Sequence, residues 1–506
     1  MRKLSVLLII GSIGIWAGCG GSGGGTPSGI PTSVVLSPSA GQSISAGGSL
    51  SITASVTTGS SSSTNVTWSL SGPGSLSSTT ANPVTYTAPT SASSNATVVV
   101  TATSVANTGS TAYIPLTVIP AGSAATANTV AAIVDGGPVP PYPNGVFTSV
   151  NICSPGTTTC QTVDHILVDT GSSGLRILQS VLSSSVSLPP LTDTNNNPIF
   201  NCVAFLDGSY LWGPVSASDL RLNGEVSGSA LVQVISSSNS GIPNGCTNGG
   251  TVNENTAALL GANGILGIGL EPTDCSLAGE NLCDGSVQGA PPVYWSCPNS
   301  SCGTNDSPIT IPGADQVVNP VVLFAADNNG DVVTFPSLGA SNMAATASGT
   351  ITFGIGTQTN NALGSATIYT LNTGDSFTTL FQGQTLIASF LDSGSNAWSF
   401  PSSLVVCTDN TTFYCPTGAT GDGLVAVNND VQPGITFEID NADTLFATND
   451  NAFATLGSPL GSPNTCSNGN GSCSFDFGFP FFYGRKVFNA IDGQNVPSQA
   501  APWFAY

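Results

Sequence analysis

Basic side chains are almost absent from this chain, and charged residues of either sign are few. The 506 residues include 6 Lys or Arg and 27 Asp or Glu, which gives a formal net charge of −21 at pH 7. Nucleic-acid binding needs a basic footprint and docking to anionic lipid needs basic patches, so the sequence argues against both. A protein this acidic loses most of its self-repulsion in mildly acidic surroundings, which suits chemistry on the acid side of neutrality.

Histidine occurs once, as His165. Ser-His-Asp triads, Cys-His pairs and His-rich zinc sites all require histidine, so these classes of site depend on this one residue. It lies inside an apolar run with no zinc motif around it, which favours an ordinary strand residue. Carboxylates are therefore the plentiful acid and base groups, and we expect neither a metal nor a cofactor.

The first apolar run of the chain is too short to span a membrane comfortably. It follows a basic start and ends at Trp16, and Cys19 comes after two small residues. This resembles a bacterial lipoprotein signal, so residues 1–18 are predicted to be a signal peptide and Cys19 the lipid-anchored first residue of the exported protein. Gly20 favours the outer membrane, and residues 19–30 form a flexible Gly/Ser tether. An ordinary signal peptide is the alternative, and export follows from either.

Residues 31–119 contain no charged side chain. Short alternating runs recur there, separated by Gly, Ser and Pro clusters, and this spacing predicts a β-sandwich. The block resembles bacterial Ig-like surface domains, with Trp68 as the core aromatic residue. Such domains serve as spacers or adhesive modules, and the spacer is favoured because no binding residues stand out. Residues 120–128 are interpreted as a linker of small residues.

Cysteine occurs 13 times, but no Cys-x-x-Cys pair is present, which argues against a zinc knuckle or a thioredoxin-type redox role. Setting Cys19 aside leaves twelve, and an even count in an exported chain implies disulfides. The spacing favours pairing of nearest neighbours, although the sequence does not fix the connectivity. The expected pairs are Cys153–Cys160, Cys202–Cys246, Cys275–Cys283, Cys297–Cys302, Cys407–Cys415 and Cys466–Cys473.

Two stretches share one pattern, in which an apolar strand runs into an acid, a hydroxyl residue, a glycine and a serine. The first contains Asp169 to Ser172 and the second contains Asp392 to Ser395. The glycine permits a sharp turn after the strand, and a carboxylate at the end of a buried strand is costly unless its neighbours hydrogen-bond it. One copy is an ordinary turn sequence, but two copies indicate a duplicated lobe with paired acids at its centre.

At these residues the chain resembles the pepsin-like aspartic peptidases, which have two similar β lobes that each give one Asp to a shared pair. The resemblance implies that Asp169 and Asp392 are the catalytic pair, which would activate a water to attack a peptide or protein held between the lobes. It also assigns supporting roles to the rest of the two loops. These residues are Thr170 and Ser393, which lock the loops together, Ser172 and Ser395, which hydrogen-bond the outer carboxylate oxygens, and the turn glycines Gly171 and Gly394.

Two apolar strands that end in Gly267 and Gly478 match the family's strands that pass under the active loops, where glycine lets two backbones approach closely. A segment before Gly267 resembles the hairpin that folds over the cleft. The candidates for its clamping aromatic residue are Phe205, Tyr210 and Trp212. Cross-strand aromatic packing is the alternative interpretation of these three residues.

The chain departs from the family's pattern in two places. Arg176 stands where family members have the Trp that supports the flap tyrosine, and Asp476 replaces an apolar residue expected just before Gly478. Residues 271–319 form an insertion with four cysteines, interpreted as a stapled surface loop.

The sequence therefore predicts an all-β chain, with the Ig-like sandwich followed by a bilobal module of an N-terminal lobe, 129–335, and a C-terminal lobe, 336–506. The leading hypothesis is an active aspartic endopeptidase that is lipid-anchored to the cell envelope. The alternative is an inactive pepsin-like binding or adhesion lipoprotein. The intact acids favour the first, and the altered flap favours the second.

Overall fold

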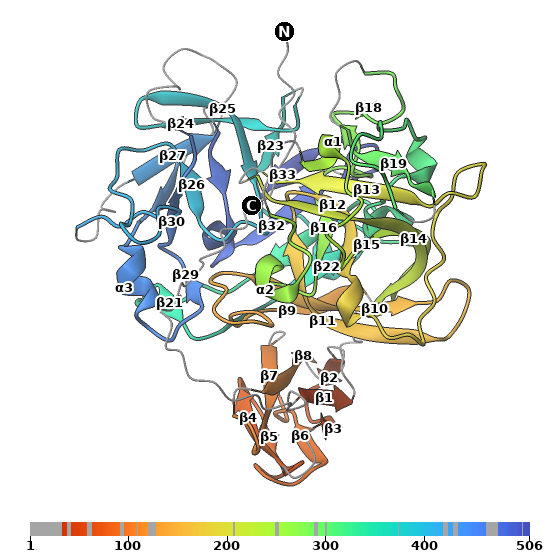
Figure 1. The fold of residues 1–506 in the computed structure, drawn as a ribbon. Helices are drawn as coiled ribbons and strands as arrows, with labels where there is room; N and C mark the ends of the chain where they lie inside the picture. The colour runs from red at the N-terminus through yellow and green to blue at the C-terminus, as the bar shows by residue number, and fades with distance from the viewer. Residues whose placement is uncertain are drawn as a thin grey trace, which may run out of the picture.

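A computed structural model describes most of the chain from Ser33 to the C-terminus. Strands dominate, so the predicted all-β fold is confirmed (Figure 1). Within the described part, no helix is long and apolar enough to cross a membrane. The predicted signal peptide, Cys19 and the tether lie outside the described residues. These are 33–37, 42–57, 63–91, 96–108, 110–119, 128–205, 208–247, 252–287, 292–298, 301–372, 374–417, 424–428, 434–461, 474–497 and 499–506.

The N-terminal block is a sandwich of two four-stranded sheets, drawn at the bottom of Figure 1. Apolar side chains of both sheets share one core, and the predicted aromatic residue Trp68 is buried in it. Strand β3 alternates buried and exposed positions because one of its faces packs and the other is solvated. The two sheets are, in spatial order, β1 (Ser33–Ser37), β3 (Ser49–Thr57), β6 (Val84–Thr87) and β5 (Ser75–Leu76), and β2 (Gln42–Ser45), β8 (Thr111–Ile119), β7 (Ala96–Ser104) and β4 (Val66–Ser71).

The sandwich packs directly against the larger module. Val99 and Tyr113 of the sandwich share a buried cluster with Phe147 and Leu167 of the module. The ring of Tyr113 meets the ring of His165 edge-on, with the ring centroids 4.6 Å apart. The block predicted to be a spacer is therefore anchored on the lobe, while its Ig-like character stays a prediction.

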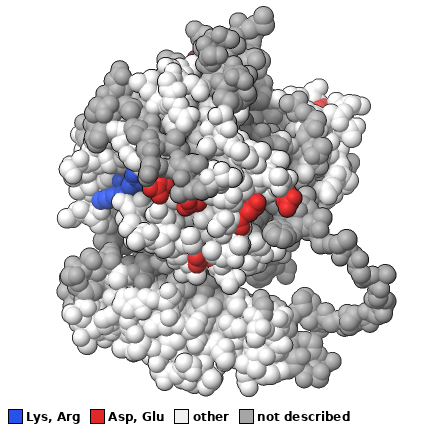
Figure 2. Space-filling view, turned by 90° about the vertical axis from the view of Figure 1, so that its left-hand side faces the viewer, with Lys and Arg blue, Asp and Glu red and all other residues white. Residues whose placement is uncertain are grey.

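The lower part of Figure 2, which is the sandwich, carries no coloured atoms on the face shown, whereas the module above it carries scattered acidic side chains and a small basic area. This follows from the sequence, in which residues 31–119 have no charged side chain. Contact between sandwich and module therefore rests on apolar and aromatic packing rather than on ion pairs between the two.

His165 is a strand residue, as predicted, but it sits at a β-bulge. Two residues of its strand oppose one residue of the partner strand there, and His165 has a φ of 48°. Burial lowers the pKa of His165, but hydrogen bonds to Asp135 and Asp164 outweigh burial and raise the pKa to about 9. The single histidine therefore stays protonated at neutral pH as the centre of a small ion cluster.

The first half of the module forms one end of a 14-stranded sheet. The last four residues of β11 are all buried, because β10 and β16 cover its edges and apolar residues fill both faces. In spatial order this end contains β19 (Tyr294–Ser296), β13 (Ile199–Ala204), β14 (Tyr210–Leu222), β15 (Glu225–Ile235), β12 (Ser173–Leu178), β16 (Gly264–Ile268), β11 (Cys160–Asp169) and β10 (Val146–Cys153).

The same sheet continues without interruption into the second half. Strand β9 pairs with β10 and β22, and β20 pairs with β22 and β32. The lobe boundary predicted at residues 335 and 336 thus falls inside one sheet, because β20 lies before it and both partners of β20 lie after it. These strands are β9 (Thr129–Val134), β22 (Ala347–Phe353), β20 (Gly330–Thr334), β32 (Lys486–Ala490), β33 (Trp503–Ala505) and β23 (Ile368–Thr370).

A seven-stranded sheet completes the second lobe, at the upper left of Figure 1. Its interior is aromatic: stacked and edge-to-face phenylalanine rings fill the space beneath the strand that leads to Asp392. The strands in spatial order are β28 (Ile435–Phe437), β27 (Leu424–Asn428), β24 (Phe377–Phe381), β25 (Gln384–Leu391), β31 (Asp476–Phe477), β26 (Trp398–Phe400) and β30 (Gly457–Pro459).

Helices in the described residues are short and connect strands. The α-helices are α1 (Asn244–Thr247), α2 (Ala257–Leu260) and α3 (Ala442–Phe446), and the 3₁₀ turns are Gln179–Val181, Gly313–Asp315, Pro320–Leu323, Thr359–Asn361 and Phe479–Phe482. Two small ladders pair β17 (Ser276–Leu277) with β18 (Glu280–Asn281) and β21 (Met343–Ala344) with β29 (Ala452–Phe453).

Candidate active site

In the first lobe, a loop carrying Asp169 joins two strands that are separated by a third. Strand β16 lies between β11 and β12, parallel to the first and antiparallel to the second. Gly267 of β16 is opposite both Asp169 and Gly174. A Cβ at position 267 would lie 2.7 Å from backbone atoms of Ser173, so only glycine lets the strand pass this close under the loop.

The second lobe repeats this arrangement. Strand β31 lies between β25 and β26, again parallel to one and antiparallel to the other. A Cβ at Gly478, directly after β31, would lie 2.1 Å from the carbonyl oxygen of Ala397. The two halves thus place an acid-bearing loop over a glycine by the same strand order, as the sequence pattern predicts.

Each acid is held by its own loop in the same way. The Gly171 N–H donates to Asp169 Oδ1 at 2.8 Å, and the Gly394 N–H donates to Asp392 Oδ1 at 2.7 Å. On the outer oxygens, the Ser172 hydroxyl donates to Asp169 Oδ2, and the Ser395 hydroxyl donates to Asp392 Oδ2 at 2.9 Å. These donors orient both carboxyl groups. Asp169 Oδ1 faces the loop that contains Gly394, and Asp392 Oδ1 faces the loop that contains Gly171.

The two carboxyl groups meet at the centre of the module. A Cβ built on Gly394 would lie 2.8 Å from Asp169 Oδ1 and 3.1 Å from Asp392 Oδ1. A Cβ on Gly171 would lie 2.6 Å from Asp392 Cγ. Each acid also forms a side-chain hydrogen bond with the other. No side chain could stand at either glycine position without displacing a carboxyl group.

Two acids this close cannot both be ionised cheaply. Burial raises the pKa of Asp169 well above its usual value, and the charge of Asp392 raises it further. Burial also raises the pKa of Asp392, but there the hydrogen bond with Asp169 acts in the opposite direction. Both side chains are fully buried. The pair therefore holds one proton between the two acids, with Asp169 as its preferred site, although the titration steps belong to the pair.

Thr170 and Ser393 join the two loops reciprocally. The Thr170 N–H donates to Ser393 Oγ at 3.1 Å, and the Ser393 N–H donates to Thr170 Oγ1 at 2.9 Å. The Ser393 hydroxyl in turn donates to the carbonyl of Val168 at 2.8 Å. These buried bonds fix the separation of the two acids, because each loop is anchored on the other.

Asn144 forms a second link between the halves, which the sequence pattern did not reveal. Its side-chain N–H groups donate to the carbonyls of Asn396 and Phe453, at 2.7 and 2.9 Å, and its oxygen accepts the Phe453 N–H at 2.7 Å. The Tyr483 hydroxyl also donates to this oxygen, at 3.0 Å. The Asn-Gly turn that contains Asn144 was the available signal, but a turn does not reveal partners 250 to 340 residues away.

Tyr142 lies beside the acid pair and was also missed. Its side chain is buried and forms a hydrogen bond with Asn396. Burial first, then the charges of Glu254, Asp169 and Asp392, raise the pKa of Tyr142. A neutral phenol therefore borders the pair from the segment that precedes β10.

The three flap candidates are all buried. Phe205 packs in the cluster that also contains Tyr142, whereas Tyr210 and Trp212 pack in a different cluster. The Trp212 ring stacks on Phe200, with the centroids 5.1 Å apart. Their hairpin, β13 with β14, is bonded to β19 and to residues 252–254, which matches the packing interpretation.

Arg176 is buried within a polar network rather than beneath a flap tyrosine. Its guanidinium lies 3.3 Å from Asp274 Oδ2, and the two side chains are 3% and 4% exposed. Tyr294 donates to Asp274 Oδ1 at 2.5 Å, and Asn201 donates to Oδ2 at 2.8 Å. Burial raises the pKa of Asp274, while Arg176 and these donors lower it. The insertion thus supplies the acid that balances Arg176.

A second pair of carboxyl groups joins the insertion to the second half of the module. Glu271 and Asp375 share a hydrogen bond, and the Ala278 N–H donates to both of them. Burial, followed by the hydrogen bond with Asp375, raises the pKa of Glu271 to about 10. This pair therefore also holds a proton at neutral pH.

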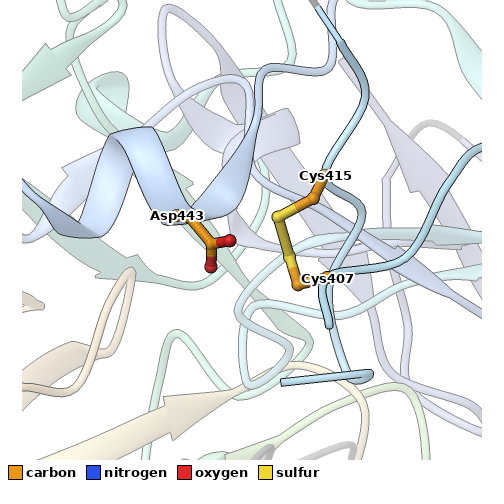
Figure 3. Close-up of side chains that lie close together, drawn as sticks. All are labelled: Cys407, Cys415 and Asp443. Carbon is orange, nitrogen blue, oxygen red and sulfur yellow. A yellow bond between two sulfur atoms is a disulfide. The ribbon is translucent and has the colours of Figure 1, made fainter. Parts of the chain in front are cut away.

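Five of the six predicted disulfides are confirmed: Cys153–Cys160, Cys202–Cys246, Cys275–Cys283, Cys297–Cys302 and Cys407–Cys415. Cys466 and Cys473 lie outside the described residues. Figure 3 shows the Asp443 carboxylate pointing toward the Cys407–Cys415 bridge. Bonded sulfurs offer no thiolate, so this trio does not make a metal centre.

A pocket of about 500 Å³ lies against the β13–β14 hairpin. Phe200, Trp212 and Pro214 form its apolar wall, and Ser216 and Ser236 contribute hydroxyls. Neither acid of the central pair lines it, so this pocket of the first lobe is separate from the pair, which both lobes form.

The comparisons with known proteins place this geometry in a family. A family model described as "Protein of unknown function (DUF3443)" matches residues 124–506. The chain belongs to this family. No curated protein matches the sequence. Among solved structures, the chain is similar to an aspartic proteinase from Irpex lacteus, with 15% identity and a TM-score of 0.42, covering 74% of this chain and 96% of that chain. At this identity no residue role transfers from that protein.

Proposed function

We propose that the module formed by residues 129–506 hydrolyses peptide bonds with a water activated by Asp169 and Asp392. The observation that carries this proposal is the pair itself: two buried carboxyl groups in hydrogen-bond contact, each fixed by one glycine N–H and one serine hydroxyl. Structural carboxylates seldom face each other, because the second ionisation is costly, whereas acid–base chemistry uses this difference between the two groups.

The reaction follows from where the proton is. Asp392, the ionised partner, takes a proton from the attacking water while Asp169 donates its proton to the carbonyl oxygen of the peptide. The new C–O bond gives a neutral tetrahedral diol. Asp392 then returns its proton to the amide nitrogen, Asp169 regains one from a diol hydroxyl, and the C–N bond breaks to an amine and a carboxylic acid. The pair ends as it began, and no covalent intermediate forms.

A second candidate function rests on burial. Both acids are 0% exposed, so a substrate reaches them only if the surrounding segments open. A module that stays closed would act in binding or adhesion, as the alternative hypothesis from the sequence has it. The two candidates differ in one measurable property, which is cleavage of a polypeptide.

The test is incubation of the purified protein with an unfolded polypeptide from mildly acidic to neutral pH, with mass spectrometry of the products. Asp169→Asn and Asp392→Asn should each reduce cleavage by on the order of 10²–10⁴-fold, since each removes one proton-transfer group. The matched control is Asp443→Asn, an exposed acid beside the Cys407–Cys415 bridge, which should leave cleavage unchanged.

Cleavage that persists in both pair variants excludes the mechanism. If the wild-type protein cleaves nothing at any of these pH values, the binding module is supported instead.

We further propose that the protein is exported and lipid-anchored at Cys19. Five disulfides support export, because such bonds persist in oxidising compartments. Incorporation of labelled palmitate into the full chain, and its loss in Cys19→Ser, would test the anchor. Equal labelling of both proteins would refute it.

A further inference from the structure

A third carboxyl group lies directly behind the pair. Asp476 is the first residue of β31, the strand that passes under the second active loop. It is opposite Phe390 in one neighbouring strand and opposite Ser399 in the other. Its side chain is 0% exposed. An acid in the middle of a sheet lined with phenylalanine needs a physical reason.

The hydrogen bonds of Asp476 do not support an ionised carboxylate. Within the described part of the chain, neither of its oxygens accepts a hydrogen bond. The Ser395 hydroxyl lies close enough to Asp476 to lower its pKa, but burial and the charge of Asp392 raise that pKa by more. The proton of this hydroxyl is donated to Asp392 Oδ2, at 2.9 Å. A buried carboxylate with no donor is strongly unfavourable.

The charges near Asp476 act in the same direction. The charge of Asp392 acts on it from the position directly after β25, and the charge of Asp169 acts on it from the last position of β11. Ser399, opposite on β26, is neutral, and no basic side chain of the described residues acts on Asp476. Burial first, and then the charge of Asp392, raise the pKa of Asp476 well above its usual value.

A protonated Asp476 resolves the missing hydrogen bonds. It has an O–H group to donate, and Ser395 Oγ has lone pairs left to accept it. The result is a directed chain, in which Asp476 donates to Ser395 and Ser395 donates to Asp392. Hydrogen bonds in such a chain polarise one another, so Ser395 becomes a stronger donor to the carboxylate it holds.

The first lobe has no counterpart of this chain. The position two residues before its loop-packing glycine is Ile265, where the second lobe has Asp476. Ser172 therefore holds Asp169 without an acid behind it. Asp476 is therefore a difference between the two loops that sets the surroundings of Asp392 apart from those of Asp169.

We propose that Asp476 is a positioning residue, which stays neutral and acts through Ser395 to make Asp392 the ionised member of the pair. Its role in catalysis rests on the proposed function, but the asymmetry of the pair exists whether or not the protein cleaves peptides. The expected size of the effect is about one pH unit in the first titration step of the pair, since a hydrogen bond to a charged group contributes that much.

The test is a titration of the full-length protein labelled with ¹³C at the aspartate carboxyl carbons, followed by NMR. Asp476 should remain protonated between about pH 4 and 8. Asp476→Leu, which removes the donor to Ser395, should raise the first step of the pair by about one unit. Asp476→Asn keeps an N–H donor in the same place and should leave that step nearly unchanged.

A third variant keeps the test decisive if Asp476→Leu fails to fold. Ser395→Ala breaks the chain without altering Asp476, and it should move the same step in the same direction. The proposal is overturned if Asp476 titrates as an ordinary carboxyl group. It is also overturned if both Asp476→Leu and Ser395→Ala leave the pair's titration as in the wild type.

The titration separates this inference from the proposed function. If the wild type cleaves no polypeptide but the pair titrates as described, the peptidase proposal fails and the role of Asp476 stands. If the wild type is active, the acid limb of its kcat/KM profile should move to higher pH in Asp476→Leu and not in Asp476→Asn. A purely structural residue would lower the amount of active protein without moving the limb.

Discussion

The two active loops differ most at one pair of facing positions beneath them. In the first lobe, Arg176 of β12 is opposite Ile265 of β16. In the second lobe, Ser399 of β26 is opposite Asp476 of β31. Each lobe thus has one buried ionisable side chain in this pair of positions. The first lobe has a base on β12, and the second lobe has an acid on β31.

The two halves stabilise these groups in different ways. Arg176 has a counter-charge, Asp274, which is itself held by Tyr294 and Asn201. Asp476 has no basic partner among the described residues, so burial keeps it protonated. A buried charge is tolerated when it is paired and hydrogen-bonded, and a buried acid without such partners gives up its charge instead.

This difference also explains what the Cys-rich insertion does. From the sequence it is interpreted as a stapled surface loop, but Cys275, Cys283 and Tyr294 share a buried cluster with Ile199 and Val215 of the lobe. The insertion therefore contributes to the interior of the first lobe and brings the partner of its buried arginine.

The largest expected effect comes from breaking the ion pair of the first lobe. Asp274→Asn leaves Arg176 buried without a counter-charge, which should destabilise the protein by about 3–5 kcal/mol. The Tyr294 hydroxyl keeps an acceptor in this variant, so the loss reports the charge. Adding Arg176→Met should recover most of the stability. Chemical denaturation measures all three proteins, and a double variant as unstable as the single one would contradict the explanation.

In the second lobe, removing the buried acid should increase the stability of the protein, and the gain should grow as pH rises. Folded Asp476 keeps its proton above the pH at which the unfolded chain releases it, so its contribution to stability is present at low pH and declines as pH rises above about 4. Asp476→Leu removes this decline. Relative to the wild type, the variant should gain up to about 1.4 kcal/mol per pH unit between pH 5 and 8. A difference in denaturation midpoints that does not change with pH would show that Asp476 ionises in the folded state.

The smallest effect concerns the two glycines beneath the loops. An added Cβ would meet the Ala397 carbonyl oxygen at 2.1 Å in Gly478→Ala, but backbone atoms at 2.7 Å in Gly267→Ala. Both variants should lose about 1–3 kcal/mol, because well-packed backbone must shift, and Gly478→Ala should lose more. Midpoints of urea unfolding would measure the stability of both variants. Equal losses of stability would mean that the backbone of the second loop shifts more easily than its packing implies.

Much of the site could be predicted from the sequence because its signals are local. The acid, hydroxyl, glycine and serine that follow each apolar strand lie within four residues, and each acid is indeed held by the glycine and serine of its own loop. The all-β class and the five disulfides in the described residues were predicted from equally short-range patterns. The charge-free sandwich with Trp68 in its core was also predicted in this way.

The contacts that were missed join segments far apart in the chain. Asn144 reaches partners in the second lobe, Tyr142 borders an acid pair whose second member is 250 residues away, and Asp274 finds Arg176 across a disulfide-bonded insertion. The role of the three flap candidates likewise depends on contacts that the sequence does not show. Aromatic residues near a hairpin tip look alike in sequence whether they cover a cleft or pack in a core, and here all three are buried.

The amino-acid sequence alone supplies the available chemistry: two acids with local donors, a single histidine, few bases and cysteines spaced for bridging. Folding sets which of these groups share an environment. Ionisation depends on burial and on neighbours within a few ångströms, and neither is encoded at any one position. Asp476 shows this most clearly, because in sequence it is one acid among 27 Asp and Glu residues, and in the fold it stands behind Asp392.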